Sequence, residues 1–199
     1  MSRKRIDRIY PRDRAAMAAL GRTGHISHQQ LGEFLRDKRI SDYCKEGLLQ
    51  KTVQSKPGDG QEDKICYRLT TTGREFCRRE LHMDRMYRAQ SVTHDMGLAD
   101  RYFSLTQEER NTWQTESHAR EEMKDHIEQL REQGNEARAN ALWDKLEKGE
   151  ISPPDAIYTT SQGVCVAFEV ITTHYGREEI LEKMEFCEEF ELTYSQSRV

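Results

Sequence analysis

Residues 27–49 read SHQQLGEFLRDKRISDYCKEGLL, and the pattern of this segment predicts the fold of the first half of the chain. Ser27 followed by Gln30 is a capping-box pattern, which predicts that a helix begins here. The apolar side of that helix carries Leu31, Phe34 and Leu35. A further short helix is predicted from the spacing of Ile40, Tyr43 and Cys44, and Gly47 ends it. The stretch therefore predicts two helices joined by a tight connection.

A β-hairpin is expected directly after this glycine. Leu49–Gln54 and Ile65–Leu69 contain strand-forming residues, and the segment SKPGDGQEDK between them is rich in turn residues. A helix over Arg12–Leu20 is predicted before the pair of helices. Helices followed by a hairpin in this order are typical of a winged helix-turn-helix, which can place one helix in the major groove of DNA.

The second half follows a different pattern. Helices are predicted over His94–Leu105, over residues 117–148 with a break at Gly134, and over Arg177–Leu192. Strands are predicted at Ile157–Thr160 and Val164–Thr172, and the apolar run VCVAFEVI is typical of a central strand. A long basic helical segment is also expected over residues 73–90.

The predicted fold class is α/β (α+β), in two domains. Residues 1–92 would form the winged helix-turn-helix, and residues 93–199 would contain a helical connector and a small α/β domain with a short mixed sheet. The two parts carry opposite charge. Residues 1–92 contain 20 Lys and Arg against 12 Asp and Glu, whereas the remainder contains 11 against 23. A basic part suits a polyanion such as DNA, because its cations neutralise phosphates and release counterions.

Candidate DNA-contacting residues follow from this interpretation. The outward positions of the predicted helix around Ile40 and Tyr43, which would reach base edges, are Arg39, Ser41, Asp42 and Lys45. Arg36 and Lys38 beside them are placed for phosphate contacts. Lys56 and Lys64 would contact DNA from the hairpin. Arg3, Lys4 and Arg5 form a basic arm that could enter a minor groove.

Three acidic residues of the second half suggest a nuclease-like pattern. A carboxylate on a helix and two on neighbouring strands can hold Mg²⁺ for phosphodiester cleavage. The residues in question are Glu116, Asp155 and Glu169, with Lys183 one helix later. A complete site of this design carries a Lys two residues after the strand Glu, but this position is Ile171. We therefore expect no catalytic activity, no metal and no cofactor.

Histidines and cysteines are interpreted as structural. His94, His118, His126 and His174 share no metal-ligand spacing and are predicted to be individual surface or capping groups. The five cysteines contain no CxxC pair and are expected to be buried free thiols in a reducing cytoplasm.

The order of these motifs resembles the replication-relaxation family of plasmids and integrative conjugative elements. The resemblance rests on GLLQK and YRLTTTG in the winged helix, His94-Asp95 at a helix start, Glu116, PPDA at 153–156, and FEVITTHYGREEILEKMEFCEEF at 168–190. It implies that the second half is a degenerate PD-(D/E)xK-like domain, in which Glu116, Asp155, Glu169 and Lys183 match the family pattern and Ile171 departs from it.

The expected function is that of a sequence-specific, double-stranded DNA-binding accessory factor of a mobile element. It would act at an origin of transfer or replication and recruit a relaxase or an initiator. A transcriptional regulator of the element and a Mg²⁺-dependent endonuclease are the alternatives. The chain has no long apolar run and no secretory signal, so we expect a cytoplasmic protein without membrane contacts, which could form a homodimer.

Overall fold

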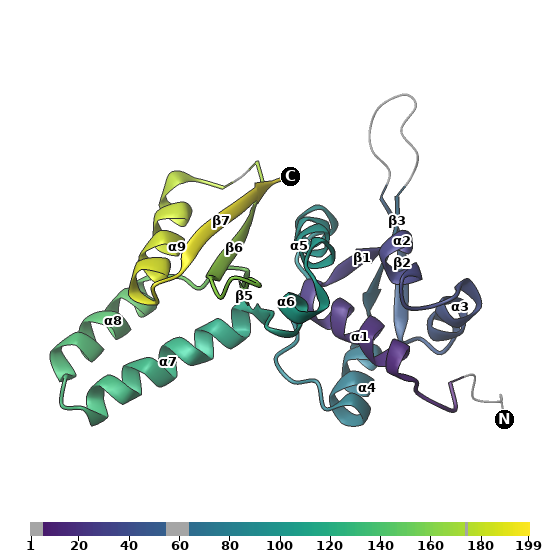
Figure 1. The fold of residues 1–199 in the computed structure, drawn as a ribbon, viewed down its shortest axis with the longest axis horizontal. Helices are drawn as coiled ribbons and strands as arrows, with labels where there is room; N and C mark the ends of the chain where they lie inside the picture. The colour runs from purple at the N-terminus through teal and green to yellow at the C-terminus, as the bar shows by residue number, and fades with distance from the viewer. Residues whose placement is uncertain (1–5, 55–63, 174) are drawn as a thin grey trace. The chain divides into compact units, whose positions relative to one another are not determined.

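The computed structural model describes residues 6–54, 64–173 and 175–199. The chain divides into two compact units, Met1–Ser104 and Leu105–Val199 (Figure 1). The sequence predicted a boundary after residue 92, but the first unit extends to Ser104. The reason is that helix α5 (Val92–Ser104) packs against α1 and β1 of the first unit.

The first unit has the element order of a winged helix-turn-helix. Its elements are α1 (Pro11–Thr23), β1 (His25–Ser27), α2 (His28–Gly32), α3 (Asp37–Lys45), β2 (Leu49–Gln54), β3 (Lys64–Leu69), α4 (Thr71–Leu81) and α5. The three strands form an antiparallel sheet in the order β1-β3-β2. The mixed helix and sheet content confirms the predicted α+β class.

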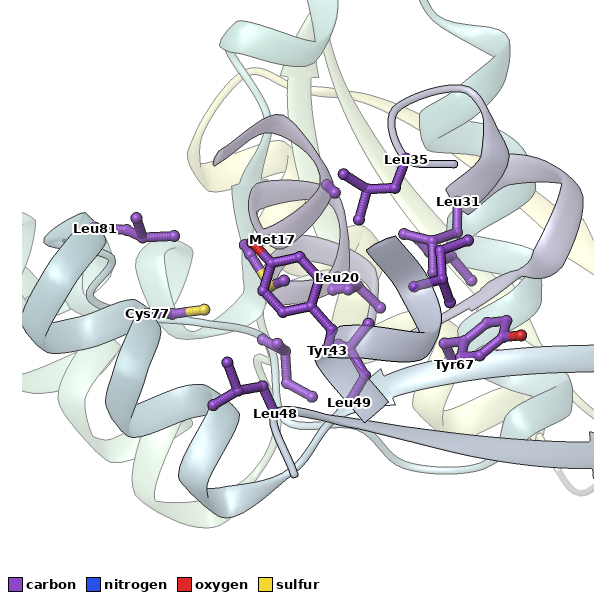
Figure 2. Packing of buried hydrophobic residues seen from close by; sticks show 14 of the residues in the cluster. Met17, Leu20, Leu31, Leu35, Tyr43, Leu48, Leu49, Tyr67, Cys77 and Leu81 are labelled. Carbon is purple, nitrogen blue, oxygen red and sulfur yellow. The ribbon is translucent and has the colours of Figure 1, made fainter. Parts of the chain in front are cut away.

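The helix-turn-helix is built as the sequence indicates. Ser27 Oγ accepts a hydrogen bond from Gln30 N at 3.1 Å, and Gln30 Oε1 accepts from Ser27 N at 2.8 Å, so the predicted capping box is present. Figure 2 shows how Leu31 and Leu35 from this region and Tyr43 from α3 point into one core with Met17 and Leu20 of α1. Burial of these side chains fixes the angle at which α3 presents its other face to solvent.

The LTTTG motif is the joint between the hairpin and α4. Thr70 N donates to Leu48 O at 3.1 Å, and Gly73 N donates to Thr70 Oγ1 at 2.9 Å. A Cβ atom on Gly73 would lie 2.0 Å from Leu48 O, closer than any real contact. A glycine at this position therefore lets α4 begin directly against the start of β2.

A helix was predicted over residues 73–90, but the structure ends it at Leu81, so the prediction is wrong beyond this residue. His82 takes a left-handed conformation (φ 55°) that ends α4. The following segment is held by hydrogen bonds in place of helical ones: Tyr87 N donates to Gly21 O at 2.7 Å, and Arg74 Nη1 donates to Tyr87 O at 2.8 Å. Arg74 thus serves the fold and is not a free member of a basic face.

The second unit consists of a mixed sheet and four helices among its described residues. The helices are α6 (Gln107–Asn111), α7 (Glu116–Glu132), α8 (Glu136–Lys148) and α9 (Arg177–Glu189). The strands are β4 (Gln114–Thr115), β5 (Ala156–Thr159), β6 (Cys165–Ile171) and β7 (Thr193–Arg198), in the order β4-β5-β6-β7. Strand β6 is central as predicted, since it pairs antiparallel with β5 and parallel with β7.

Helices α7 and α8 pack side by side (Figure 1), and the chain turns between them at Gly134. Their apolar sides meet Phe186 of α9 in a second core. Polar contacts join the same three helices, because Glu189 Oε1 lies 3.2 Å from His126 Nε2 and 2.8 Å from Arg138 Nη2. Within the described residues, no helix is both long and apolar enough to cross a membrane.

Candidate nucleic-acid interface

The solvent face of α3 carries three of the predicted DNA-contacting residues. Lys38 and Lys45 are exposed and Ser41 is half-buried. The Lys38 side chain is 92% exposed, and its Nζ lies 3.7 Å from Asp42 Oδ2. A pair at this distance with a solvated ammonium is weak, so Lys38 can exchange Asp42 for a phosphate or a base.

Acidic groups share this face. Asp37 begins α3, and its Oδ1 lies 3.2 Å from His28 Nε2. Arg36, the exposed residue just before α3, faces solvent beside it. Carboxylates among the cations of this face repel phosphates, so the face does not favour binding to any DNA regardless of sequence. A carboxylate can instead accept a hydrogen bond from the amino group of cytosine.

The hairpin adds two lysines. Lys64 begins β3 and is exposed, as predicted for a contact from the wing. Lys51 on β2 is also exposed and was not predicted. Lys51 lies close enough to Cys44 of α3 for its charge to lower the pKa of that thiol, although burial raises this pKa more. Lys51 therefore extends the α3 surface onto β2.

The remaining predicted contacts lie outside the described residues. These are Lys56 in the hairpin loop and Arg3, Lys4 and Arg5 at the N-terminus.

Arg39 lies on α3 but faces the protein. Its Nε donates to Asp13 Oδ1 at 2.9 Å, and its Nη2 donates to Asp13 Oδ2 at 2.8 Å. Nη2 also donates to Arg8 O at 2.6 Å. The guanidinium carbon lies 5.7 Å from the ring centroid of Tyr10 and 5.2 Å from that of Tyr43. The geometry gives Arg39 a structural position and does not favour the base contact predicted for it.

Electrostatics around Asp13 agree with this assignment. Asp13 is only 2% exposed, and burial alone would raise its pKa, but hydrogen bonds from Arg39 and from the Tyr10 backbone lower it below its ordinary value. Burial, followed by the negative charge of Asp13, raises the pKa of Tyr43. Asp13 is therefore a buried carboxylate that depends on its partner.

A signal for the Arg39 contact exists in the sequence. Asp13 stands three, four and seven residues before Ala16, Met17 and Leu20, so it falls on the buried stripe of α1. A carboxylate on such a stripe requires a cation or several donors, because an unpaired buried charge is costly. Arg39 stands four residues before buried Tyr43, at the edge of the face that packs against α1.

In the second unit, three of the four predicted nuclease-like residues come together. Glu169 is fully buried, Asp155 is 4% exposed and Lys183 is 8% exposed. Lys183 Nζ lies 3.4 Å from Glu169 Oε1 and donates to Pro153 O at 2.6 Å. Glu116 stands apart: its backbone N donates to Asp155 O at 3.1 Å, but its carboxylate pairs with Arg120 at 2.8 Å.

Both buried carboxylates are used inside the protein. Asp155 Oδ2 accepts from Val170 N at 2.9 Å, and Glu169 Oε2 accepts from Asp155 N at 2.8 Å. The Tyr175 hydroxyl donates to Glu169 Oε1. Burial and the nearby charge of Asp155 raise the pKa of Glu169 to about 7, and Lys183 opposes this shift. The cluster as placed holds β5, β6 and α9 together and does not present an open carboxylate pair.

Metal-ligand geometry is not found in the part of the chain that the structure describes: no group of three His, Cys, Asp or Glu there could hold an ion. The prediction that His94 is a surface or capping group is wrong, because it is 4% exposed and its Nδ1 lies 3.1 Å from the Tyr87 hydroxyl. All five cysteines are free, but Cys165 is exposed at the start of β6, contrary to the expectation of burial. His174 lies outside the described residues.

No protein-family model and no curated protein matches the chain. Among solved structures, it is similar to PadR of Bacillus subtilis in complex with operator DNA. The identity is 17%, the match covers 70% of this chain and 79% of that chain, and the TM-score is 0.25.

Proposed function

We propose that the chain binds double-stranded DNA in a sequence-specific manner, with α3 in the major groove. The observation that carries the proposal is the arrangement of α2, α3 and the β2–β3 hairpin in one unit, with Lys38, Ser41 and Lys45 on the solvent face of α3. A helix of this kind fits the major groove, and its exposed side chains reach base edges. Arg36, Lys51 and Lys64 supply cations for the flanking phosphates.

Within this activity, we propose the role of an accessory factor of a mobile genetic element. The factor acts at an origin of transfer or replication and recruits a relaxase or an initiator. Two features support this role: the motif order that resembles the replication-relaxation family, and the acidic second half, which suits a protein partner better than DNA. We further propose a homodimer, because two copies of the helix-turn-helix would bind a palindromic site.

The test is a selection of bound fragments from the DNA of the native element, using the full chain. Enrichment of an origin region supports the accessory role, whereas enrichment of promoters alone supports the alternative of a transcriptional regulator. Two half-sites about one helical turn apart would support the dimer. If no fragment is enriched over random DNA at low salt, the DNA-binding proposal is wrong.

A second candidate, a Mg²⁺-dependent endonuclease, is favoured by one observation: Asp155, Glu169 and Lys183 lie together. The engagement of both carboxylates and the apolar Ile171 two residues after Glu169 weigh against it. We expect no nicking of plasmid DNA with Mg²⁺ or Mn²⁺. Metal-dependent nicking that disappears in both Asp155→Ala and Glu169→Ala would establish the endonuclease instead.

A further inference from the structure

Residues 6–10, directly before α1, are part of the folded first unit. This segment, which does not include the basic residues 3–5, is called the arm below. The Ile6 side chain is 3% exposed and joins the core that α1 and α3 share. Ile9 is half-buried and packs on the same core. Between them, the carbonyl of Arg8 accepts the hydrogen bond from Arg39. The path of the arm is thus fixed both by apolar burial and by a side chain of α3.

Arg39 fastens the arm at a second point through α1. Tyr10 N donates to Asp13 Oδ2 at 2.8 Å, on the carboxylate that Arg39 grips with two nitrogen atoms. The guanidinium also lies over the Tyr10 ring and over the Tyr43 ring. Only a planar fork can grip a carboxylate with two nitrogens and stack on rings at the same time, so arginine is required here.

The anchored arm presents its polar groups beside the exposed face of α3. Arg8 is exposed, and its guanidinium carbon lies 5.5 Å from the ring centroid of Tyr10, which is itself 50% exposed. Arg39 is turned by about 100° from Lys38 around α3, which places it between the solvent face and the buried face of the helix. Because Arg39 binds the carbonyl of Arg8, the arm lies at the edge of the surface proposed to enter the groove. A cation at that edge meets the phosphate backbone, whereas the centre of the helix meets the bases.

We propose that the arm is a second DNA-contacting element, in which Arg8 binds a phosphate and Arg39 is the positioning residue that holds the arm against α3. This inference rests on the proposed DNA binding. In this inference, Arg39 fixes the position of the arm relative to α3 on the DNA and does not itself contact a base.

The experiment measures the affinity of the full chain for its selected site and for a random duplex of equal length, over a range of salt. Arg8→Ala should weaken binding to both duplexes by the same factor and reduce the salt slope by about 0.9, the value for one phosphate on B-DNA. Arg39→Gln should give at least the same loss. Combining the two changes should add nothing to Arg39→Gln alone, because the arm is already released. Arg79→Ala, which removes an exposed cation from α4, is the charge-matched control.

Arg39→Lys separates positioning from direct contact. Lysine keeps the charge but cannot grip Asp13 with two nitrogens, so it should fail as Arg39→Gln does. A direct phosphate contact would survive in Arg39→Lys, and a direct base contact would show as a loss of preference for the selected site. Either result, or additive losses of Arg8→Ala and Arg39→Gln, overturns the inference while DNA binding stands. If the wild-type chain binds neither duplex, the proposed function falls and the inference falls with it.

A change at Arg39 leaves Asp13 buried without its cation and could unfold the unit. The double variant Asp13→Asn/Arg39→Gln replaces the ion pair by neutral groups of similar size and keeps the test valid in a folded chain. A readout without DNA is tryptic cleavage after Arg8. This cleavage should be several-fold faster in the double variant, and an unchanged rate would show that Arg39 does not hold the arm.

Discussion

Asp95 is fully buried where α5 packs against β1. His25 Nδ1 lies 2.7 Å from its Oδ2, and the Tyr87 hydroxyl donates to its Oδ1 at 3.3 Å. Burial alone would raise the pKa of Asp95, but hydrogen bonds from His25 and His94 lower it below its ordinary value. A single carboxylate therefore joins β1, α5 and the segment that follows α4.

Gly24 leaves room for this carboxylate. Its φ is +84°, and an added Cβ would lie 2.3 Å from Asp95 Oδ2. We predict that Gly24→Ala lowers the free energy of unfolding of the first unit by about 2–4 kcal/mol, since backbone strain and overpacking add. Urea unfolding followed by far-UV circular dichroism measures the change.

Gly47→Ala is the matched control for Gly24→Ala. Gly47 has a φ of +70°, but no atom lies within 4 Å of an added Cβ, so only the backbone term applies and the loss should be about 1 kcal/mol. Equal losses at the two positions would show that the contact with Asp95 does not restrict residue 24.

At the scale of elements, the sequence predicted those that follow a strong apolar period. The hairpin strands, central β6 and the helices other than α6 are of this kind. Helix α6 has no buried residue and was not predicted. Three strands were missed. Strands β1 and β4 have only three and two residues, and β7 (TYSQSR) is polar and half-exposed, so it has no apolar alternation to detect. The end of α4 at His82 depends on hydrogen bonds from distant parts of the chain, which no local pattern contains.

In the candidate site, too, features set by a local pattern could be predicted, and features that depend on distant residues could not. Lys38, Lys45 and Lys64 are exposed as predicted because they stand outside the apolar positions of their elements. The role of Arg39 depends on Asp13, which is distant in sequence, so the pattern of α3 alone could not reveal it. The closeness of Glu169 and Lys183 could be predicted from their order, but the hydrogen bonds that occupy the carboxylates could not.

The cluster around Glu169 predicts a pH dependence of the second unit. The folded chain holds the Glu169 proton up to about pH 7, whereas the ordinary carboxyl value is 4.5. Folding therefore takes up a proton, and the free energy of unfolding falls as the pH rises through this window, by up to about 3 kcal/mol. Glu169→Gln cannot ionise and should remove this slope. Urea titrations at pH 5 and pH 8 measure it, with tryptophan fluorescence as the signal.

Tryptophan fluorescence suits this measurement because both tryptophans of the chain, Trp113 and Trp143, belong to the second unit. Glu188→Gln on α9 is the control, because Glu188 is exposed and its removal should leave the slope as in the wild type. If the wild type and Glu169→Gln lose stability equally between the two pH values, the raised pKa of Glu169 does not govern the unit.

The two units of the molecule differ in charge, and each has its own hydrophobic core. Residues 1–104 contain 21 Lys and Arg against 14 Asp and Glu, and residues 105–199 contain 10 against 21. Each unit has a separate hydrophobic core. The basic unit holds the elements proposed to contact DNA, so the affinity for DNA should reside in a part of the chain that can fold by itself.

A pair of fragments tests this division and the position of the boundary together. Residues 1–104 should fold and bind duplex DNA, with an affinity that falls steeply as salt rises, and residues 105–199 should not bind.

A fragment that stops at residue 92 lacks α5, so the buried side chains of Leu98, Ala99 and Tyr102 and the Asp95 partner of His25 are lost. We expect this shorter fragment to unfold well below the melting temperature of residues 1–104 and to bind DNA weakly at 37 °C. Calorimetry and a fluorescence-polarisation titration measure the two properties. Equal stability of the two fragments would place the boundary before α5, and DNA binding by residues 105–199 at the level of residues 1–104 would contradict the assignment of DNA contacts to the winged helix.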